Sequence, residues 1–360
     1  MKIILGLLIA ITLVKCSSIN PSSDSANKPK ATSQPGEIIL VMDSTHWNSN
    51  LGNALNETFR SNTIGLPRPE SLFTIRHIKP RDFKSILKNV KNIIVVYVLN
   101  NKSSNSRILK NLFTPNSIQQ MSSDSSIFLL SKSDEWARGQ EVLYLFGQSE
   151  KQLADHIMKN KDKIQLHFNN IEKERLNASL YVAKELKEVG SLLSRNHGFS
   201  LRVPFGWRIE YEDPNEPFIW LRNPGIDIDK NIWVYYQDYN GPGDFDNIIQ
   251  LRNKVTKRYI FDDKEMNDTS YVVVETIVPP VINETSFKGQ YSREMKGLWK
   301  TNNLSMGGPF LSYIVADPSI NRLYYIDGFI YSPGKSQRES MREIETILWT
   351  FSTSQSSTKP

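Results

Sequence analysis

The sequence predicts an α+β protein, in which a layered α/β domain is followed by an antiparallel sheet backed by helices. In the first half, apolar strand-like runs alternate with segments of helical spacing, which is typical of a layered α/β domain. In the second half, short strand-like segments follow one another with few helices between them, which favours an antiparallel sheet. A chain of 360 residues is long enough for two domains of ordinary size.

Shifts in composition and pattern divide the chain further. The predicted segments are a leader (1–16), a flexible tether (17–35), an N-terminal α/β domain (36–150), a helical connector (151–197), a C-terminal α+β domain (198–352) and a disordered tail (353–360). The tether is predicted because this stretch is rich in Ser, Asn, Pro and Lys and has almost nothing to bury.

The N-terminal domain begins with an apolar strand at residues 37–43, which ends at Asp43. Leu51, Leu55 and Phe59 then recur at helical spacing, which predicts a helix over 48–61. The remaining expectations are strands at 73–78, 92–99, 127–130 and 142–146, a short helix starting at 80–82, and two helices within 150–195.

The C-terminal domain is predicted to start after Gly198 and to hold most of the tryptophans. Strands are expected at 199–207, 208–212, 218–222, 232–236, 271–278, 289–300, 310–317 and 322–331, with helices at 246–259 and 339–351. Of the seven tryptophans, all except Trp47 and Trp136 lie in this half, which indicates a large aromatic core, a binding face, or both.

The leader contains the only cysteine of the chain. Lys2 provides a positive start, and residues 3–14 form an uncharged run of 12 residues. A spanning helix needs about 20 apolar residues, so this run is typical of a signal sequence rather than a permanent span. Because Cys16 comes just after the run, the leader predicts a lipoprotein export signal in which Cys16 is lipidated and becomes the mature N-terminus.

Lys15 is a departure from this pattern, since a small side chain is preferred before the lipidated cysteine. Simple secretion and an uncleaved anchor are therefore the alternatives. No acidic run follows Cys16, so we expect a lipid-anchored protein of the cell envelope, in the outer membrane and facing the periplasm. The net charge of +6 is a mild excess and does not predict a nucleic-acid partner.

Several stretches carry a resemblance to a known family. They are FIWLR (218–222), KGLW (296–299), MGGPF (306–310) and GFIYSP (328–333) in the second half, with 36–43 and GLPR (65–68) in the first. They resemble the hallmark stretches of a family of uncharacterised Bacteroidota lipoproteins that carry a domain of unknown function. Lys296 stands where that pattern has Arg, and only Arg binds a carboxylate bidentately.

This resemblance implies an envelope lipoprotein and supplies no activity, cofactor or catalytic residue. More loosely, residues 199–207, the paired strands after them and the closing helix are similar to the PsbP/Mog1-like fold. That similarity concerns the fold alone, which does not imply a function.

Paired glycines give the best candidate for a binding site in the second half. Gly307 and Gly308 allow a ligand or a second chain to approach the backbone closely. Trp299 and Phe310 flank them, and Arg293 adds positive charge on the strand of Trp299, so an aromatic-lined site for an anion or a glycan is one interpretation. The other, which we favour, is a hairpin connection that needs Gly for its turn.

Other candidate chemistry is weaker. Asp227, Asp229 and Asn231 have the spacing of a calcium loop, but Ile232 occupies the position where a sharp turn needs Gly, so a solvated turn is favoured. His46 follows the strand that ends at Asp43, where sites often lie in α/β sheets, but an exposed imidazole at a helix boundary is the simpler interpretation. Nucleophile-elbow, phosphate-loop and dinucleotide fingerprints are absent, so we predict no catalytic residue, metal or cofactor.

Three hypotheses about function follow. The first is a non-enzymatic binding or assembly module of the envelope with a protein or glycan partner. The second is a hydrolase acting on envelope glycan or peptide, for which Asp317, Arg222 and Arg252 would join the residues around Trp299 and Phe310. The third is that the basic helix over 252–258 binds an acidic partner.

Overall fold

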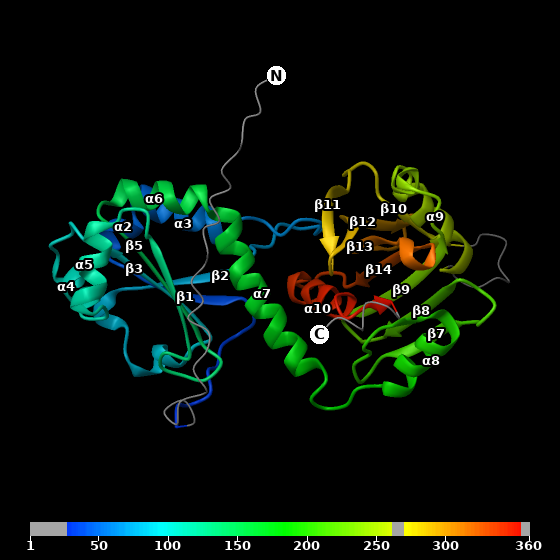
Figure 1. Cartoon of the computed structure of the whole chain (residues 1–360), viewed down its shortest axis with the longest axis horizontal. Helices are drawn as coiled ribbons and strands as arrows, with labels where there is room; N and C mark the ends of the chain where they lie inside the picture. Colours follow the sequence, from blue (N-terminus) through cyan, green and yellow to red (C-terminus); the bar gives the residue numbers. More distant parts are fainter. Residues whose placement is uncertain (1–26, 261–269, 354–360) are drawn as a thin grey trace, which may run out of the picture. The chain divides into compact units, whose positions relative to one another are not determined.

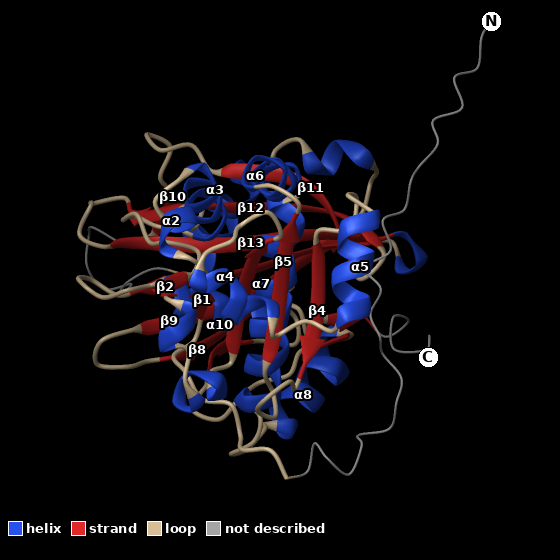
Figure 2. Cartoon of the chain, turned by 90° about the vertical axis from the view of Figure 1, so that its left-hand side faces the viewer, coloured by secondary structure: helices blue, strands red, loops and turns tan. Residues whose placement is uncertain are grey.

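The computed structural model describes residues 27–260 and 270–353, which form two compact units (Figure 1). The first unit holds the described residues up to Arg60 together with Phe73–Lys161, and the second holds Ser61–Leu72 and the described residues from Asp162 on. Helices and strands take up similar shares of the chain (Figure 2), which confirms the predicted α+β class. The predicted leader with Cys16, the first part of the tether and tail residues 354–360 lie outside the described residues.

The first unit is built on a five-stranded, mostly parallel sheet. Its order is β2 (Thr74–Ile78), β1 (Glu37–Val41), β3 (Asn92–Val98), β5 (Glu141–Gly147) and β4 (Leu129–Ser133), and only β4 is antiparallel to its neighbour. Every residue of β3 and β5 is buried, as expected for central strands covered on both faces.

Helices follow the strands of this sheet. They are α2 (Ser44–Trp47), α3 (Asn50–Phe59), α4 (Ser104–Lys110), α5 (Pro115–Ser123) and α6 (Glu150–Lys159), with short 3₁₀ turns η1 (Pro80–Asp82) and η2 (Ser85–Asn89). Leu109 of α4 and Met121 of α5 join the apolar core on one face of the sheet. Helices α3 and α6 pack against each other, and α6 also packs against β5.

The strand order brings the ends of β1 and β3 together. The chain passes from β1 to β2 on one side and then to β3 on the other side of β1. In open α/β sheets, ligands bind beyond the carboxyl ends of the strands, at the point where the strand order changes direction. A ligand site is therefore expected at this edge of the sheet.

The second unit is built on an antiparallel sheet of eight strands. Along the sheet run β10 (Val272–Val274), β12 (Gln290–Thr301), β13 (Gly307–Asp317), β14 (Arg322–Tyr331), β9 (Asp229–Asp238), β8 (Phe218–Asn223) and β7 (Arg208–Glu212), while β11 (Val281–Phe287) also pairs with β12. A separate two-stranded ladder joins β6 (Phe199–Ser200) to β15 (Ser352–Thr353).

Helices cover both faces of this sheet. Because successive side chains of a strand point to opposite faces, each strand contributes to two apolar cores. Phe218 and Trp233 belong to the core beneath α9 (Ile248–Tyr259). Their neighbours in sequence belong to the opposite core, to which α8 (Lys187–His197) and α10 (Arg338–Leu348) contribute. Helix α7 (Lys161–Leu180) connects to α10 through the ion pair of Lys173 and Glu345, 3.3 Å apart.

Several elements differ from the sequence-based expectation. Three helices, α6, α7 and α8, occupy 150–197 instead of two, because α6 ends at Lys159 and residues 181–186 are not helical. Helices α4 and α5 and strand β11 were not predicted. The helices have weak apolar periodicity, although Thr114 and Pro115 are ordinary helix-start residues.

The described end of the predicted tether belongs to the fold of the first unit. Residue Lys30 forms a bridge with Arg138, and the buried Ala31 donates its backbone N–H to the Arg138 carbonyl at 2.9 Å. The backbone N–H of Thr32 bonds to the Asn89 carbonyl at 2.8 Å. A polar composition predicted flexibility here, but backbone pairing and one small apolar side chain suffice to fix these residues in the first unit.

Candidate functional site

A connected group of polar side chains lies at the carboxyl ends of β1 and β3. Asp43 comes two residues after β1 and is 3 % exposed. Its Oδ1 accepts the backbone N–H of Thr45 at 3.1 Å and so caps α2. Its Oδ2 accepts the hydroxyl of Ser103 at 2.5 Å and the Nδ2 of Asn101 at 3.4 Å. Ser103 in turn caps α4 by accepting the N–H of Ser106.

His46 extends this group toward β5. Its Nδ1 lies 2.8 Å from Oε2 of Glu150, the first residue of α6, and its Nε2 lies 2.9 Å from Nδ2 of Asn101. Oδ1 of Asn101 accepts the N–H of Ser103, so its NH₂ group must face His46 and Asp43. The imidazole is then neutral, with its proton on Nδ1 donated to Glu150 and its Nε2 accepting from Asn101.

The two carboxylates of this group are held in their charged forms. A hydrogen bond from Ser49 is the main cause that lowers the pKa of Glu150 below its ordinary value, and His46 adds to it. Burial alone would raise the pKa of Asp43, but hydrogen bonds from Ser103, Thr45 and Asn101 outweigh burial, and the pKa is lowered.

The lowered pKa of Asp43 predicts a loss of stability in acid. A carboxyl with a folded-state pKa below the unfolded value of 3.8 contributes stability that is fully present above that pH and is lost as pH falls through the folded-state pKa. Urea unfolding of the wild type between about pH 2 and pH 5 should therefore show a steeper loss of stability than unfolding of Asp43→Asn. Asp155→Asn, an exposed change on α6, is the control, and equal slopes for wild type and Asp43→Asn would contradict the prediction.

A hollow of about 390 Å³ opens beside His46. It is lined by His46, Val98, Asn100, Asn101, Lys102, Ser149 and Glu150, which come from the ends of β1, β3 and β5. All of its lining residues except Val98 carry a polar or charged group, and together they offer amides, a hydroxyl, a carboxylate and an ammonium group beside the apolar parts of the same side chains. Such a set favours a ligand that both donates and accepts hydrogen bonds.

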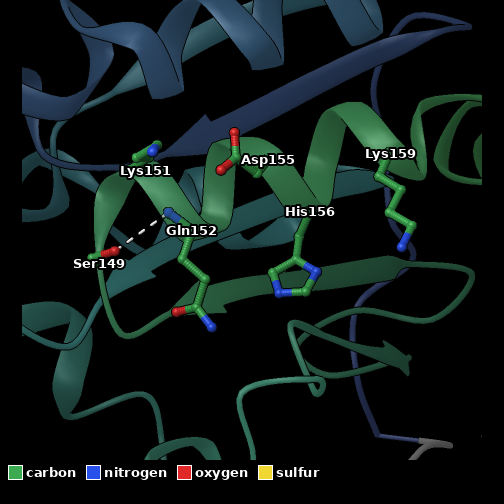
Figure 3. Close-up of a pocket in the computed structure, with 6 residues that line it drawn as sticks. All are labelled: Ser149, Lys151, Gln152, Asp155, His156 and Lys159. Carbon is green, nitrogen blue, oxygen red and sulfur yellow. Dashed lines mark hydrogen bonds between the residues drawn. The ribbon is translucent and has the colours of Figure 1, made fainter.

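A second hollow of about 400 Å³ lies along α6 and shares Ser149 with the first (Figure 3). Its lining residues are Ser149, Lys151, Gln152, Asp155, His156 and Lys159. The ring of His156 stacks on Phe128 with centroids 4.9 Å apart, so this imidazole is engaged in packing. Unlike the hollow beside His46, this one is formed along a single helix and not where several strands end.

Asn101 is the hydrogen-bond partner of Nε2 of His46. Within residues 27–260 and 270–353, no serine, threonine or tyrosine hydroxyl contacts Nε2 of His46, because Asn101 occupies that nitrogen. No group of three or more His, Cys, Asp or Glu residues suited to a metal ion occurs in the same part of the chain. The network holds these side chains in fixed orientations, which binding and catalysis both require.

Five of the eight candidate binding residues in the second unit come together, and four of them lie within its core, whereas Gly307 is exposed. Arg252 is fully buried on α9, where its Nε lies 2.8 Å from Oδ2 of Asp327 and its guanidinium lies 4.0 Å from the ring centroid of Phe310. Trp299 is buried as well, and its Nε1 donates to the Ile330 carbonyl at 3.0 Å. The expectation that Arg252 belongs to an exposed basic face is wrong, because it pairs with an acidic residue inside the protein.

Gly307 and Gly308 lie in strand β13, paired with Lys300 and Trp299. They are not in the hairpin turn, which is formed by residues 302–306. A Cβ atom on Gly308 would collide with the Ile330 carbonyl oxygen, and one on Gly307 would press on the Trp299 carbonyl. These glycines are needed because neighbouring strands and the Trp299 indole approach closely, which leaves a ligand no room beside Gly308.

The other three candidates lie apart from this cluster and from one another. Arg222 forms a salt bridge with Asp229, in which its Nη2 lies 2.6 Å from Oδ2. Arg293 donates to the Phe245 carbonyl at 2.7 Å. Asp317 is 2 % exposed and accepts the Thr353 hydroxyl at 2.7 Å. None of these three residues lines either of the two hollows described above.

Sequence reasoning singled out Asp43 and His46 but missed Asn101, Ser103 and Glu150. A signal for them exists, since polar residues follow the apolar runs of β3 and β5 just as Asp43 follows β1. The carboxyl ends of neighbouring parallel strands meet at one edge, so these residues become a candidate set once the strands are taken as parallel.

Comparisons with known proteins agree with an uncharacterised family. Residues 186–350 match the family model described as "Domain of unknown function (DUF4837)", and residues 31–181 match "Domain of unknown function (DUF8532)". No curated protein matches the chain. Among solved structures, a human protein titled "StarD13 (DLC2) lipid transfer and protein localization domain" is similar over 46 % of this chain and 96 % of its own, at 10 % identity. Its TM-score of 0.21 is too low to indicate a shared fold.

Proposed function

We propose that this chain, both halves of which match domains of unknown function, is a lipid-anchored protein of the bacterial cell envelope that faces the periplasm and acts as a non-enzymatic binding module. The support for anchoring is the short apolar leader followed by the single cysteine, Cys16, together with the resemblance to Bacteroidota lipoproteins. In the described part of the chain, no helix is both long enough and apolar enough to cross a bilayer.

The observation that carries the binding role is the hydrogen-bonded group beside the hollow of the first unit. Asp43, Asn101, His46 and Glu150 form an unbroken chain of contacts across the ends of β1, β3 and β5. Each of these side chains is held in one orientation before any ligand arrives, so little conformational entropy is lost on binding.

We propose a glycan as the ligand class. Sugar hydroxyls donate and accept hydrogen bonds, as does the amide of Asn100 that lines the hollow. Glu150 accepts from hydroxyl or amide donors, and Lys102 suits a carboxylate on the ligand. The disaccharide of N-acetylglucosamine and N-acetylmuramic acid carries hydroxyls, amides and one carboxylate, and a periplasm-facing protein would meet it in the cell wall.

A glycan hydrolase is the second candidate, because one observation favours it. Glu150 fixes His46 in the tautomer whose Nε2 can accept a proton, which is the arrangement of a general base. Asn101 occupies Nε2, so Asn101 must first move before this nitrogen can activate a water molecule.

The anchoring proposal predicts a clear result for Cys16→Ser. The wild type should incorporate radiolabelled palmitate and sediment with membranes, whereas Cys16→Ser should show neither property, since the thioether forms on that sulfur. Lys15→Ala is the matched control, and it should keep the label because a small residue suits the position before the cysteine. An unlabelled wild type, or a Cys16→Ser variant that stays in the membrane fraction, would contradict lipidation.

A further inference from the structure

The second unit exposes apolar side chains on the loops at one end of its sheet. We call Phe205, Ile226, Leu304 and Met306 the apolar rim; their exposed fractions are 65 %, 106 %, 72 % and 38 %. Ile226 lies between β8 and β9, and Leu304 and Met306 lie between β12 and β13. Phe205 precedes β7.

Strand register places these loops at the same end of the sheet. Asn223 pairs with Lys230 at the β8–β9 turn, and Lys300 pairs with Gly307 at the β12–β13 turn. Across the sheet, the last residue of β14, Tyr331, pairs with Asp229, the first of β9. The two hairpins are separated by β14 only, so their centres are about 14 Å apart at the usual strand spacing. Arg208, just after the Phe205 turn, pairs with Arg222 at the same end.

The stability of the fold does not explain why the apolar rim has a leucine at position 304. Its φ of 61° lies in the left-handed region, which suits Gly or Asn better than Leu. Its side chain is also mostly exposed to water, so neither its backbone nor its packing favours an apolar residue. An unfavourable residue held at an exposed tip points to a role outside the fold.

We propose that the apolar rim inserts into the surface of a phospholipid bilayer. The tips are separate and do not form one continuous patch, which suits a fluid lipid surface better than a shaped protein surface. The proposal rests on the anchoring proposed above. Between Cys16 and Lys28, a described residue that donates to the Asp134 carbonyl of the first unit, the chain can span at most about 43 Å. An anchored protein is therefore always near the bilayer, so weak insertion suffices to orient it.

Vesicle flotation tests the rim without any need for lipidation. The probe is the mature chain carrying Cys16→Ser, mixed with vesicles of phosphatidylethanolamine and phosphatidylglycerol. The double variant Ile226→Ser, Leu304→Asn should lower the vesicle-bound fraction by about tenfold. Thermal unfolding should show no loss of stability, because Asn suits the backbone at position 304.

Ile86→Ser is the matched control, since Ile86 is 82 % exposed but lies in the first unit. This control should float as well as the parent chain. No flotation of the parent chain, or equal flotation of parent and double variant, would overturn the proposal. A concentration-dependent dimer in sedimentation that the double variant abolishes would also overturn it, by assigning the rim to contacts between copies. Palmitate labelling of Cys16 is independent of all these outcomes, so failure of the rim and failure of anchoring are distinguishable.

Discussion

Asp327→Leu should lower the free energy of unfolding of the second unit by about 3–5 kcal/mol, because it leaves the charge of Arg252 buried without a partner. Both side chains of this pair are fully buried. Asp327 also accepts the hydroxyl of Ser312 at 2.5 Å, so its loss strands a second polar group. Urea unfolding followed by tryptophan fluorescence measures the effect, since most tryptophans lie in this unit.

Two further variants separate a structural role of Arg252 from a binding role. The double variant Arg252→Met, Asp327→Leu should recover most of the loss, because apolar residues can replace a buried ion pair. Arg258→Met on the same helix should cost less than about 1 kcal/mol, since the Arg258–Glu216 pair is largely exposed. If Asp327→Leu were as stable as the wild type, Arg252 would not be a core residue and the basic-helix hypothesis would return.

Loss of binding should be the largest effect of changes in the hollow of the first unit. Asn100 and Lys102 line it but lie outside the chain of hydrogen bonds from Asp43 to Glu150. Asn100→Ala combined with Lys102→Met should therefore weaken binding of the soluble disaccharide by at least about tenfold while the unfolding transition stays unchanged, since a hydrogen bond to a charged group contributes about 1.5–3 kcal/mol. Isothermal titration calorimetry measures the affinity.

Lys159→Met provides the control, because Lys159 lines the second hollow on α6 and should leave the affinity unchanged. Equal binding by the wild type and the Asn100, Lys102 double variant would exclude the hollow beside His46. Disaccharide recovered intact after the titration agrees with a binding module, whereas its release as two monosaccharides would favour the hydrolase.

The fold class could be predicted because burial leaves a strong pattern in the sequence. Strands β3 and β5 are apolar on both faces, so their runs are continuous and easy to recognise. Strand β11 was missed because five of its seven residues are exposed, and its polar residues give no clear alternation. The inclusion of Ser61–Leu72 in the second unit could not be predicted, since it depends on contacts far away in the sequence.

The surroundings of the candidate residues in the second unit also depend on partners that are distant in the sequence. A charged residue is seldom buried unless it is paired, so Arg252 was expected at the surface. Its partner Asp327 lies 75 positions further along the chain and becomes a neighbour only through the packing of α9 on β14. Likewise, the requirement for Gly308 comes from Trp299 and Ile330, which strand register brings beside it.

Only part of the candidate site could be predicted from the sequence, for a similar reason. Asp43 and His46 follow a recognisable strand, so their position alone drew attention. Asn101 and Glu150 join them only because the strand order is β1, β3, β5, and a single sequence does not contain that order. The hydrogen bonds that fix the tautomer of His46 depend on this arrangement of strands.

The central claim is that the hollow beside His46 binds an envelope glycan, and chemical-shift mapping tests it most directly. The isotope-labelled chain is titrated with the soluble disaccharide of N-acetylglucosamine and N-acetylmuramic acid, and amide and imidazole signals are followed by NMR. We predict shifts at His46, Asn101 and Glu150, with signals of Trp299, Gly307 and Gly308 unchanged. Shifts confined to the second unit, or none at any disaccharide concentration, would contradict the claim.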